Sequence, residues 1–203
     1  MKINEPVESV INEVKGDLLS QWIRGSVFVK DGKPMRFYHG SSRSFDQFDD
    51  INNMGGFYFF PEKYKDLTEP FAAGSGEVGG YEKERQGQQV YVVYLKSKKP
   101  LDLRRKPSPQ FIKQIQKLAD KEGPDSPLHY SVEDLKQDPS SYWELFDDKD
   151  YFLNAVKELG YDSVLLQETG GWSVMVFEPH QIKSAIGNRG TFDSKSKKIH
   201  ESL

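Results

Sequence analysis

The apolar residues of this chain are concentrated in short runs that have the length and composition of β-strands. The clearest run is Gln89–Leu95, Gln-Val-Tyr-Val-Val-Tyr-Leu, in which β-branched and aromatic residues predominate. Similar runs cover residues 36–39, 57–60, 163–166 and 173–177. Helical stretches separate some of these runs, but without the regular strand–helix alternation that builds a doubly wound parallel sheet. The pattern therefore predicts an α+β fold.

The segments between the runs predict helices and turns. Val7 to Ile23 has apolar residues at helical spacing, and Asp31-Gly32 is a hairpin signal between two apolar runs. Pro100 to Leu103 is expected to end the element that begins at Gln89. The expected organisation is an N-terminal helix (1–25), one domain (26–193) with a helical insert (107–150), and a polar tail (194–203) that frays.

Composition limits the classes of protein that the chain can belong to. A chain of 203 residues buries enough surface for one core, and its 13 Phe, 10 Tyr and 3 Trp indicate a folded protein. The net charge of −3 gives no overall attraction to nucleic acid or to an anionic membrane. The absence of cysteine excludes disulfides, thiolate nucleophiles and Cys-ligated zinc. His129 and His180 have no partner at metal-ligand spacing, so no metal site is expected.

The sequence contains no apolar stretch of the roughly 20 residues that a membrane span requires. Its N-terminus also lacks the apolar core of a secretory signal. We therefore expect a soluble protein of the cytoplasm with no membrane partner.

Two motifs in the strand-like runs point to a function. Residues 36–42 read Arg-Phe-Tyr-His-Gly-Ser-Ser, which places His39 and the bare backbone of Gly40 at the end of a strand. Nineteen residues after His39, Tyr58 lies in the run Gly-Gly-Phe-Tyr-Phe-Phe at 55–60. Together with the closing segment 176–188, these motifs resemble the ADP-ribosyltransferase superfamily in its His-Tyr-acid branch, of the phage and prophage polyvalent-protein type. The resemblance spans about residues 20–193.

The resemblance implies a split antiparallel sheet with helical insertions, and a pocket for NAD as co-substrate. By the family pattern, His39 hydrogen-bonds a ribose hydroxyl and Gly40 holds the carboxamide through its backbone. Tyr58 stacks on the nicotinamide, Phe71 is the candidate for the second face of the ring, and Ser42 adds a polar contact. A cationic pyridinium is attracted to aromatic faces, which suits such residue types.

The acid of this branch is where the sequence departs from the family. Aligning 174–177 with the closing strand puts Ser173 at the position of the glutamate, and serine cannot supply a negative charge. Glu168, ahead of the Gly170-Gly171 turn, is the preferred relocated acid. Glu178 is the other carboxylate nearby, but capping of the following helix is a sufficient explanation for it. Loss of the acid is the third possibility.

The resemblance therefore implies a mono-ADP-ribosyltransferase that modifies a macromolecule, with a host or bacterial protein as the expected target. A nucleic acid is less expected, although residues 96–106 hold six Lys and Arg that suit an acidic target or RNA. Such a run is more often a solvated edge. The alternatives are an NAD glycohydrolase, and a catalytically inactive NAD-pocket fold that serves as an interaction module.

Overall fold

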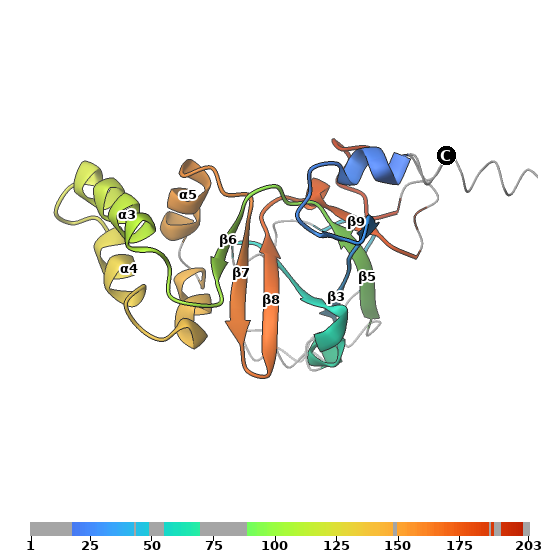
Figure 1. Cartoon of the computed structure of the whole chain (residues 1–203), viewed down its shortest axis with the longest axis horizontal. Helices are drawn as coiled ribbons and strands as arrows, with labels where there is room; N and C mark the ends of the chain where they lie inside the picture. Colours follow the sequence, from blue (N-terminus) through green and yellow to red (C-terminus); the bar gives the residue numbers. More distant parts are fainter. Residues whose placement is uncertain are drawn as a thin grey trace, which may run out of the picture.

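A seven-stranded mixed sheet forms the centre of the molecule (Figure 1). The computed structural model describes residues 18–42, 44–48, 55–69, 89–147, 150–186, 188 and 192–200. The strands are β3 (Arg36–Ser41), β4 (Phe57–Pro61), β5 (Gln89–Leu95), β6 (Pro100–Leu103), β7 (Ser163–Glu168), β8 (Gly171–Val176) and β9 (Ile182–Ser184). They lie in the order β6-β7-β8-β4-β3-β5-β9, and these neighbours are antiparallel except β6 and β7. The predicted α+β class is confirmed.

The sheet is split where β3 meets β4. The two strands pair only at Phe37 with Pro61 and at Tyr38 with Phe60. On its other side β3 pairs with β5 along its whole length, from Arg36 to Ser41. The last three residues of β3 thus extend beyond its ladder with β4, and the sheet opens at that point.

Each face of the sheet carries its own hydrophobic core, because successive side chains of a strand point to opposite faces. On β4, Phe57 and Phe59 join a cluster with Phe37, Phe48 and Ile199, which we call the aromatic core. Tyr58 packs instead against a cluster that includes residues of the helical insert, which we call the helical core.

The helical core is built by the segment that links β6 to β7. It contains α3 (Pro109–Glu122), α4 (Leu128–Asp134), the 3-10 helix η3 (Pro139–Leu145) and α5 (Asp150–Glu158), which Figure 1 shows grouped at one end of the molecule. Ser108 caps α3 by accepting a hydrogen bond from the Phe111 N–H, and Gly123 ends it with a φ of 113°. Three of these helices, α3, α4 and η3, lie within residues 107–150. Within the described residues, no helix has both the length and the apolar character needed to cross a membrane.

The turn at Asp31-Gly32 forms, but its hairpin is smaller than predicted. It joins the two-residue strands β1 (Val29–Lys30) and β2 (Lys33–Pro34). Asp31 and Gly32 both have positive φ, 51° and 74°, as a two-residue hairpin turn of type I′ requires. The strand that carries His39 pairs in the main sheet instead. Of the predicted N-terminal helix, residues 18–23 are helical and 7–17 lie outside the described residues.

The prediction that residues 100–103 end the preceding element was wrong. They form β6, which lies at the far edge of the sheet, parallel to β7. Asp162 causes the change of direction: its carboxylate accepts hydrogen bonds from the Lys98 and Lys99 N–H groups and from the Ser97 hydroxyl. These bonds fix the turn after β5 beside the start of β7.

The prediction that the C-terminal tail frays was also wrong for residues 192–200. Ile199 is fully buried in the aromatic core, and Gln47 forms a β-bridge with Lys198. Fraying was predicted from the polar composition of the tail, but the aromatic core takes up the apolar side chain of Ile199.

Candidate active site

His39 lies in the opening between β3 and β4 and links the two strands. Its Nδ1 is 2.8 Å from the backbone oxygen of Tyr58, at the level where ladder hydrogen bonds are missing. A carbonyl oxygen can only accept, so Nδ1 carries the proton. In the neutral ring Nε2 is then a free lone pair, which suits it to accept a hydrogen bond from a hydroxyl group.

The His39 ring is surrounded by aromatic side chains of the aromatic core. The ring centroids of Phe48, Phe59 and Phe45 lie 5.0, 5.4 and 6.2 Å from that of His39. Burial among these groups lowers the pKa of His39, although the bond to Tyr58 opposes the shift. The imidazole is therefore held in its neutral form.

Gly40 and Ser42 follow His39 at the open edge. Gly40 pairs with Val90 of β5 but lies beyond the part of β3 that is paired with β4. Its position is compatible with the backbone contact to a carboxamide that the family pattern implies. Ser42 is buried just after β3. Phe71, the candidate for the second face of the nicotinamide, lies outside the described residues.

Tyr58 occupies the other face of β4, towards the helical core. Gly56 allows β4 to approach β8 there, since a Cβ at position 56 would lie 2.4 Å from Cγ of Met175 and 3.0 Å from the oxygen of Val176. Burial, followed by the negative charges of Glu168 and Asp147, raises the pKa of Tyr58. The phenol stays protonated, and its ring belongs to the same face of the sheet as Glu168.

Glu168 and Ser173 form the polar pair of this face. The Ser173 hydroxyl donates a hydrogen bond of 2.6 Å to Oε1 of Glu168, across the hairpin in which β7 and β8 are paired. Glu168 is partly buried and Ser173 is fully buried. Burial raises the pKa of Glu168, while the bond from Ser173 lowers it. The Glu168 carboxylate therefore contacts Ser173, the residue that the alignment with the family places at the position of the acid.

A short helix covers the hairpin turn next to Glu168. The 3-10 helix η2 (Glu62–Thr68) follows β4 directly, and a Cβ at Gly171 would lie 2.8 Å from Cγ of Tyr64 and 3.2 Å from Cδ1 of Leu67. The Gln167 amide also braces the turn by donating to the oxygen of Gly171 at 2.9 Å. Neither Tyr64 nor Asp147 stands in a sequence motif that would mark it as a site residue. The only hint was the second glycine of the Gly170-Gly171 pair, whose close backbone contact requires the absence of a side chain.

Glu178 lies elsewhere, beyond the opposite end of β8. Its carboxylate is half-exposed and pairs with the Lys157 ammonium at 3.2 Å. It precedes η4 (Pro179–Gln181), and its N–H donates to Oε1 of Gln181 at 2.9 Å. The structure thus brings Glu168, Ser173 and Tyr58 to one face and attaches His39 to the Tyr58 backbone, whereas Glu178 has a local partner.

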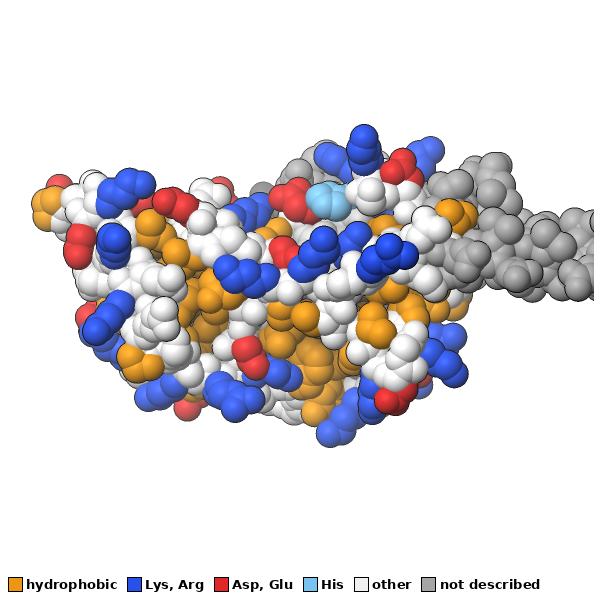
Figure 2. All heavy atoms as spheres, turned by 45° about the horizontal axis from the view of Figure 1, so that its top comes forward, with side chains coloured by type: hydrophobic (Ala, Val, Ile, Leu, Met, Phe, Trp, Pro, Cys, Tyr) orange, Lys and Arg blue, Asp and Glu red, His pale blue; other side chains and the backbone are white. Residues whose placement is uncertain are grey.

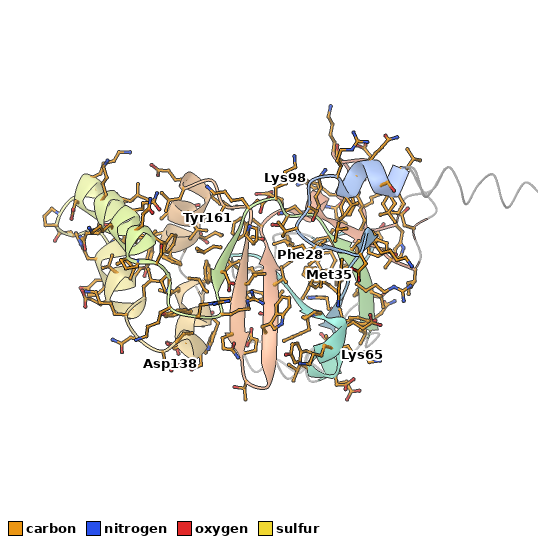
Figure 3. The ribbon with its side chains drawn as sticks, viewed as in Figure 1. Phe28, Met35, Lys65, Lys98, Asp138 and Tyr161 are labelled. Carbon is orange, nitrogen blue, oxygen red and sulfur yellow. The ribbon has the colours of Figure 1, made fainter. Side chains whose placement is uncertain are left out.

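A groove of about 370 Å³ lies at this other end and is separate from the candidate site. Its lining includes Lys98, Tyr161 and Glu178, and Figure 3 shows the first two at the opposite end of the sheet from Lys65 of η2. Lys99, in the first part of the basic run, donates to the oxygen of Leu159 at 2.8 Å.

The basic run 96–106 is divided by β6 and does not form one patch. At its far end Arg104 pairs with Asp102 at 2.7 Å, and the Lys106 ammonium donates to the oxygen of Lys136 at 3.1 Å. In the face shown in Figure 2, Lys and Arg side chains are dispersed among acidic and apolar ones. The arrangement is that of a solvated surface.

A split α+β sheet with His39 at the opening and a carboxylate on the closing hairpin has the features expected of an ADP-ribosyltransferase-like domain. The model of a family described as "ADP-Ribosyltransferase in polyvalent proteins" matches residues 30–192, and the chain belongs to this family. The resemblance drawn from the sequence is confirmed, and with it the ADP-ribosyltransferase-like fold.

Two further comparisons complete this result. A solved structure described as "Crystal structure of an anti-CRISPR protein" is similar at 17% identity and a TM-score of 0.39, over 70% of this chain and 89% of that one. No curated protein matches the sequence.

Proposed function

We propose that the protein is a mono-ADP-ribosyltransferase that transfers ADP-ribose from NAD to a macromolecule, with Glu168 as its acid. One observation carries the proposal: the 2.6 Å hydrogen bond from Ser173 to Glu168. Ser173 stands where the family places its glutamate, and this bond holds a carboxylate from the neighbouring strand against that position. The serine at position 173 is therefore consistent with a site that has kept its acid on the neighbouring strand.

The proposed reaction breaks the bond between the nicotinamide nitrogen and C1′ of the ribose. The bonding electron pair leaves with nicotinamide, which becomes neutral, and positive charge develops on the ribose. A nucleophilic atom of the acceptor then bonds to C1′ and loses its proton. A carboxylate beside the sugar stabilises the developing charge and hydrogen-bonds the adjacent hydroxyl. Glu168 would supply this charge.

The remaining roles are those of binding and orientation. Nε2 of His39 would accept a hydrogen bond from a ribose hydroxyl, because its Nδ1 already donates to Tyr58. Gly40 would hold the carboxamide through its backbone, Tyr58 would stack on the nicotinamide, and Ser42 and Phe71 would complete the pocket. A neutral histidine suits a site that must also accept a pyridinium cation.

A protein of a bacterium or of an infected host cell is the proposed target, with the cytoplasm as the place of action and a phage or bacterial effector as the origin. The net charge of −3 and the divided basic run favour protein over nucleic acid. If water replaces the acceptor, the same chemistry gives NAD hydrolysis.

The test is transfer of label from tagged NAD into bacterial lysate, with nicotinamide release measured in parallel. Glu168→Gln keeps the shape of the side chain and removes its charge, so it should abolish labelling while NAD still binds. Glu178→Gln is the matched control, because its ion pair is half-exposed and such pairs contribute only about 0–1 kcal/mol. It should retain labelling, and His39→Ala should lose it.

Other outcomes would change the conclusion. Nicotinamide release without labelled protein would indicate a glycohydrolase. Full activity of Glu168→Gln would refute the acid assignment. Binding of NAD by the wild type without release of nicotinamide would indicate an interaction module that has kept an inactive pocket.

A further inference from the structure

The C-terminal segment 192–200 lies almost wholly beyond the region that the family model matches, which ends at residue 192. It nevertheless packs against the elements that surround His39. Ile199 is fully buried in the aromatic core, to which Phe48 also belongs. A segment outside the family pattern thus contributes to the face of the sheet that holds a proposed site residue.

Backbone hydrogen bonds place the tail between β9 and the loop 44–48. The Ser184 N–H donates to the oxygen of Ile199 at 3.0 Å. The Ile199 N–H in turn donates to the oxygen of Asp46 at 2.9 Å, and Lys198 forms a β-bridge with Gln47. The tail therefore continues the hydrogen-bonded edge from β9 to the loop.

A buried ammonium group holds the tail in this position. Lys183 of β9 has no exposed surface, and its Nζ donates to the oxygen of Ser196 at 2.9 Å and to that of Lys198 at 3.1 Å. A buried charge is costly unless it is hydrogen-bonded, so the tail carbonyls are an essential part of its surroundings. The docked tail is a specific arrangement.

The loop 44–48 carries two of the aromatic rings that surround His39. Phe48 lies 5.0 Å from the His39 ring in an edge contact, and Phe45 lies 6.2 Å from it. The other anchor of the loop is Tyr91, whose ring stacks on Phe45 at 4.4 Å and whose hydroxyl accepts from the Phe45 N–H at 2.6 Å. The loop is thus held by Tyr91 on one side and by the tail on the other.

We propose that Ile199 is a positioning residue of the candidate active site, because it holds the loop 44–48 against His39 and so fixes the imidazole that binds the NAD ribose. The loop part of this proposal stands on the contacts alone, and the NAD part rests on the proposed function. Ile199 acts through Phe48 and the loop and does not itself touch the co-substrate.

The test compares Ile199→Ala with Ile115→Ala. Ile115 is also fully buried, but it lies in the helical core on α3, so it controls for the loss of a buried isoleucine as such. A misplacement of about 1 Å at a reactive group can reduce activity on the order of 100-fold. We expect Ile199→Ala to weaken NAD binding about tenfold, a moderate part of that range, and Ile115→Ala to leave it near the wild-type value. Ile199→Val should restore most of the affinity.

A second readout does not depend on NAD. Hydrogen exchange of the Phe45 amide, measured by NMR, should accelerate in Ile199→Ala and remain slow in Ile115→Ala. Unchanged exchange in Ile199→Ala, or equal loss of NAD affinity in both alanine variants, would overturn the proposal. If the wild type does not bind NAD, the proposed function fails, while faster exchange of Phe45 still supports the role of Ile199 in holding the loop.

Discussion

The close approach of β4 and β8 at Gly56 gives a sharp test of how the site is built. A Cβ at this position would lie 2.4 Å from Cγ and 2.7 Å from Sδ of Met175, and 3.0 Å from the backbone oxygen of Val176. Real Cβ contacts do not come this close, so Gly56→Ala must displace Met175, β4 or both. Met175 is fully buried in the helical core and has little free space into which to move.

The cost follows from the number of extra atoms and from the tightness of the core. Inserting one methyl group into a packed interior typically costs about 1–3 kcal/mol. Since the backbone oxygen of Val176 also limits the space, we expect the upper half of this range, about 2–3 kcal/mol. For a chain of this size the melting temperature should fall by about 4–12 °C. Tyr58 is two residues further along β4, so NAD binding should weaken as well.

A double-mutant cycle with Met175→Ala tests the cause. Met175→Ala alone should cost about 2–5 kcal/mol, because it leaves a cavity. In the double variant the new methyl group fills part of that cavity. The combined loss in urea unfolding should therefore be smaller than the sum of the two single losses by about 1–3 kcal/mol. Additivity within about 0.5 kcal/mol would refute the reasoning, because it would mean that the two side chains do not compete for the same space.

Two pH-dependent predictions follow from the polar groups of the site. Ser173→Ala removes the hydrogen bond that lowers the pKa of Glu168, so this pKa should rise. The acidic limb of the pH profile of kcat/KM for NAD should then move to higher pH. An unchanged acidic limb would contradict this. For His39, burial lowers the pKa in the native state. Below about pH 6.5 the unfolded chain therefore binds a proton that the native state does not bind. The free energy of unfolding falls with pH from there until the native pKa is reached. Wild-type protein should therefore lose more urea stability between pH 7.5 and 5.5 than His39→Asn, and equal losses would argue against a buried neutral ring.

Local patterns predicted the elements that depend on neighbouring residues. The aromatic run at 57–60 and the β-branched run at 89–95 both form strands, because alternation and composition are properties of a few consecutive residues. The turn at Asp31-Gly32 formed for the same reason.

Features that depend on distant residues were not predictable in this way. β6 pairs with β7 because Asp162 binds the backbone at Lys98 and Lys99, more than sixty positions earlier in the sequence. The tail is ordered because Ile199 and Lys183 meet partners that no local pattern reveals. The choice of Glu168 over Glu178 rested on the expected position of a turn, and the contact with Ser173 became visible only once β7 and β8 were paired.

The order in which a ribosome makes this chain gives the tail a further consequence. β4 is complete at residue 61, but its neighbour β8 begins at residue 171 and the loop at Asp46 waits for residue 199. At a synthesis rate of about 5–20 residues per second, roughly 7–28 s separate the completion of β4 from the synthesis of residue 199. During this time the loop 44–48 lacks its backbone hydrogen bond to Ile199, so the nascent chain has an incomplete support for the surroundings of His39. The proposed NAD site is therefore complete only after synthesis has passed residue 199.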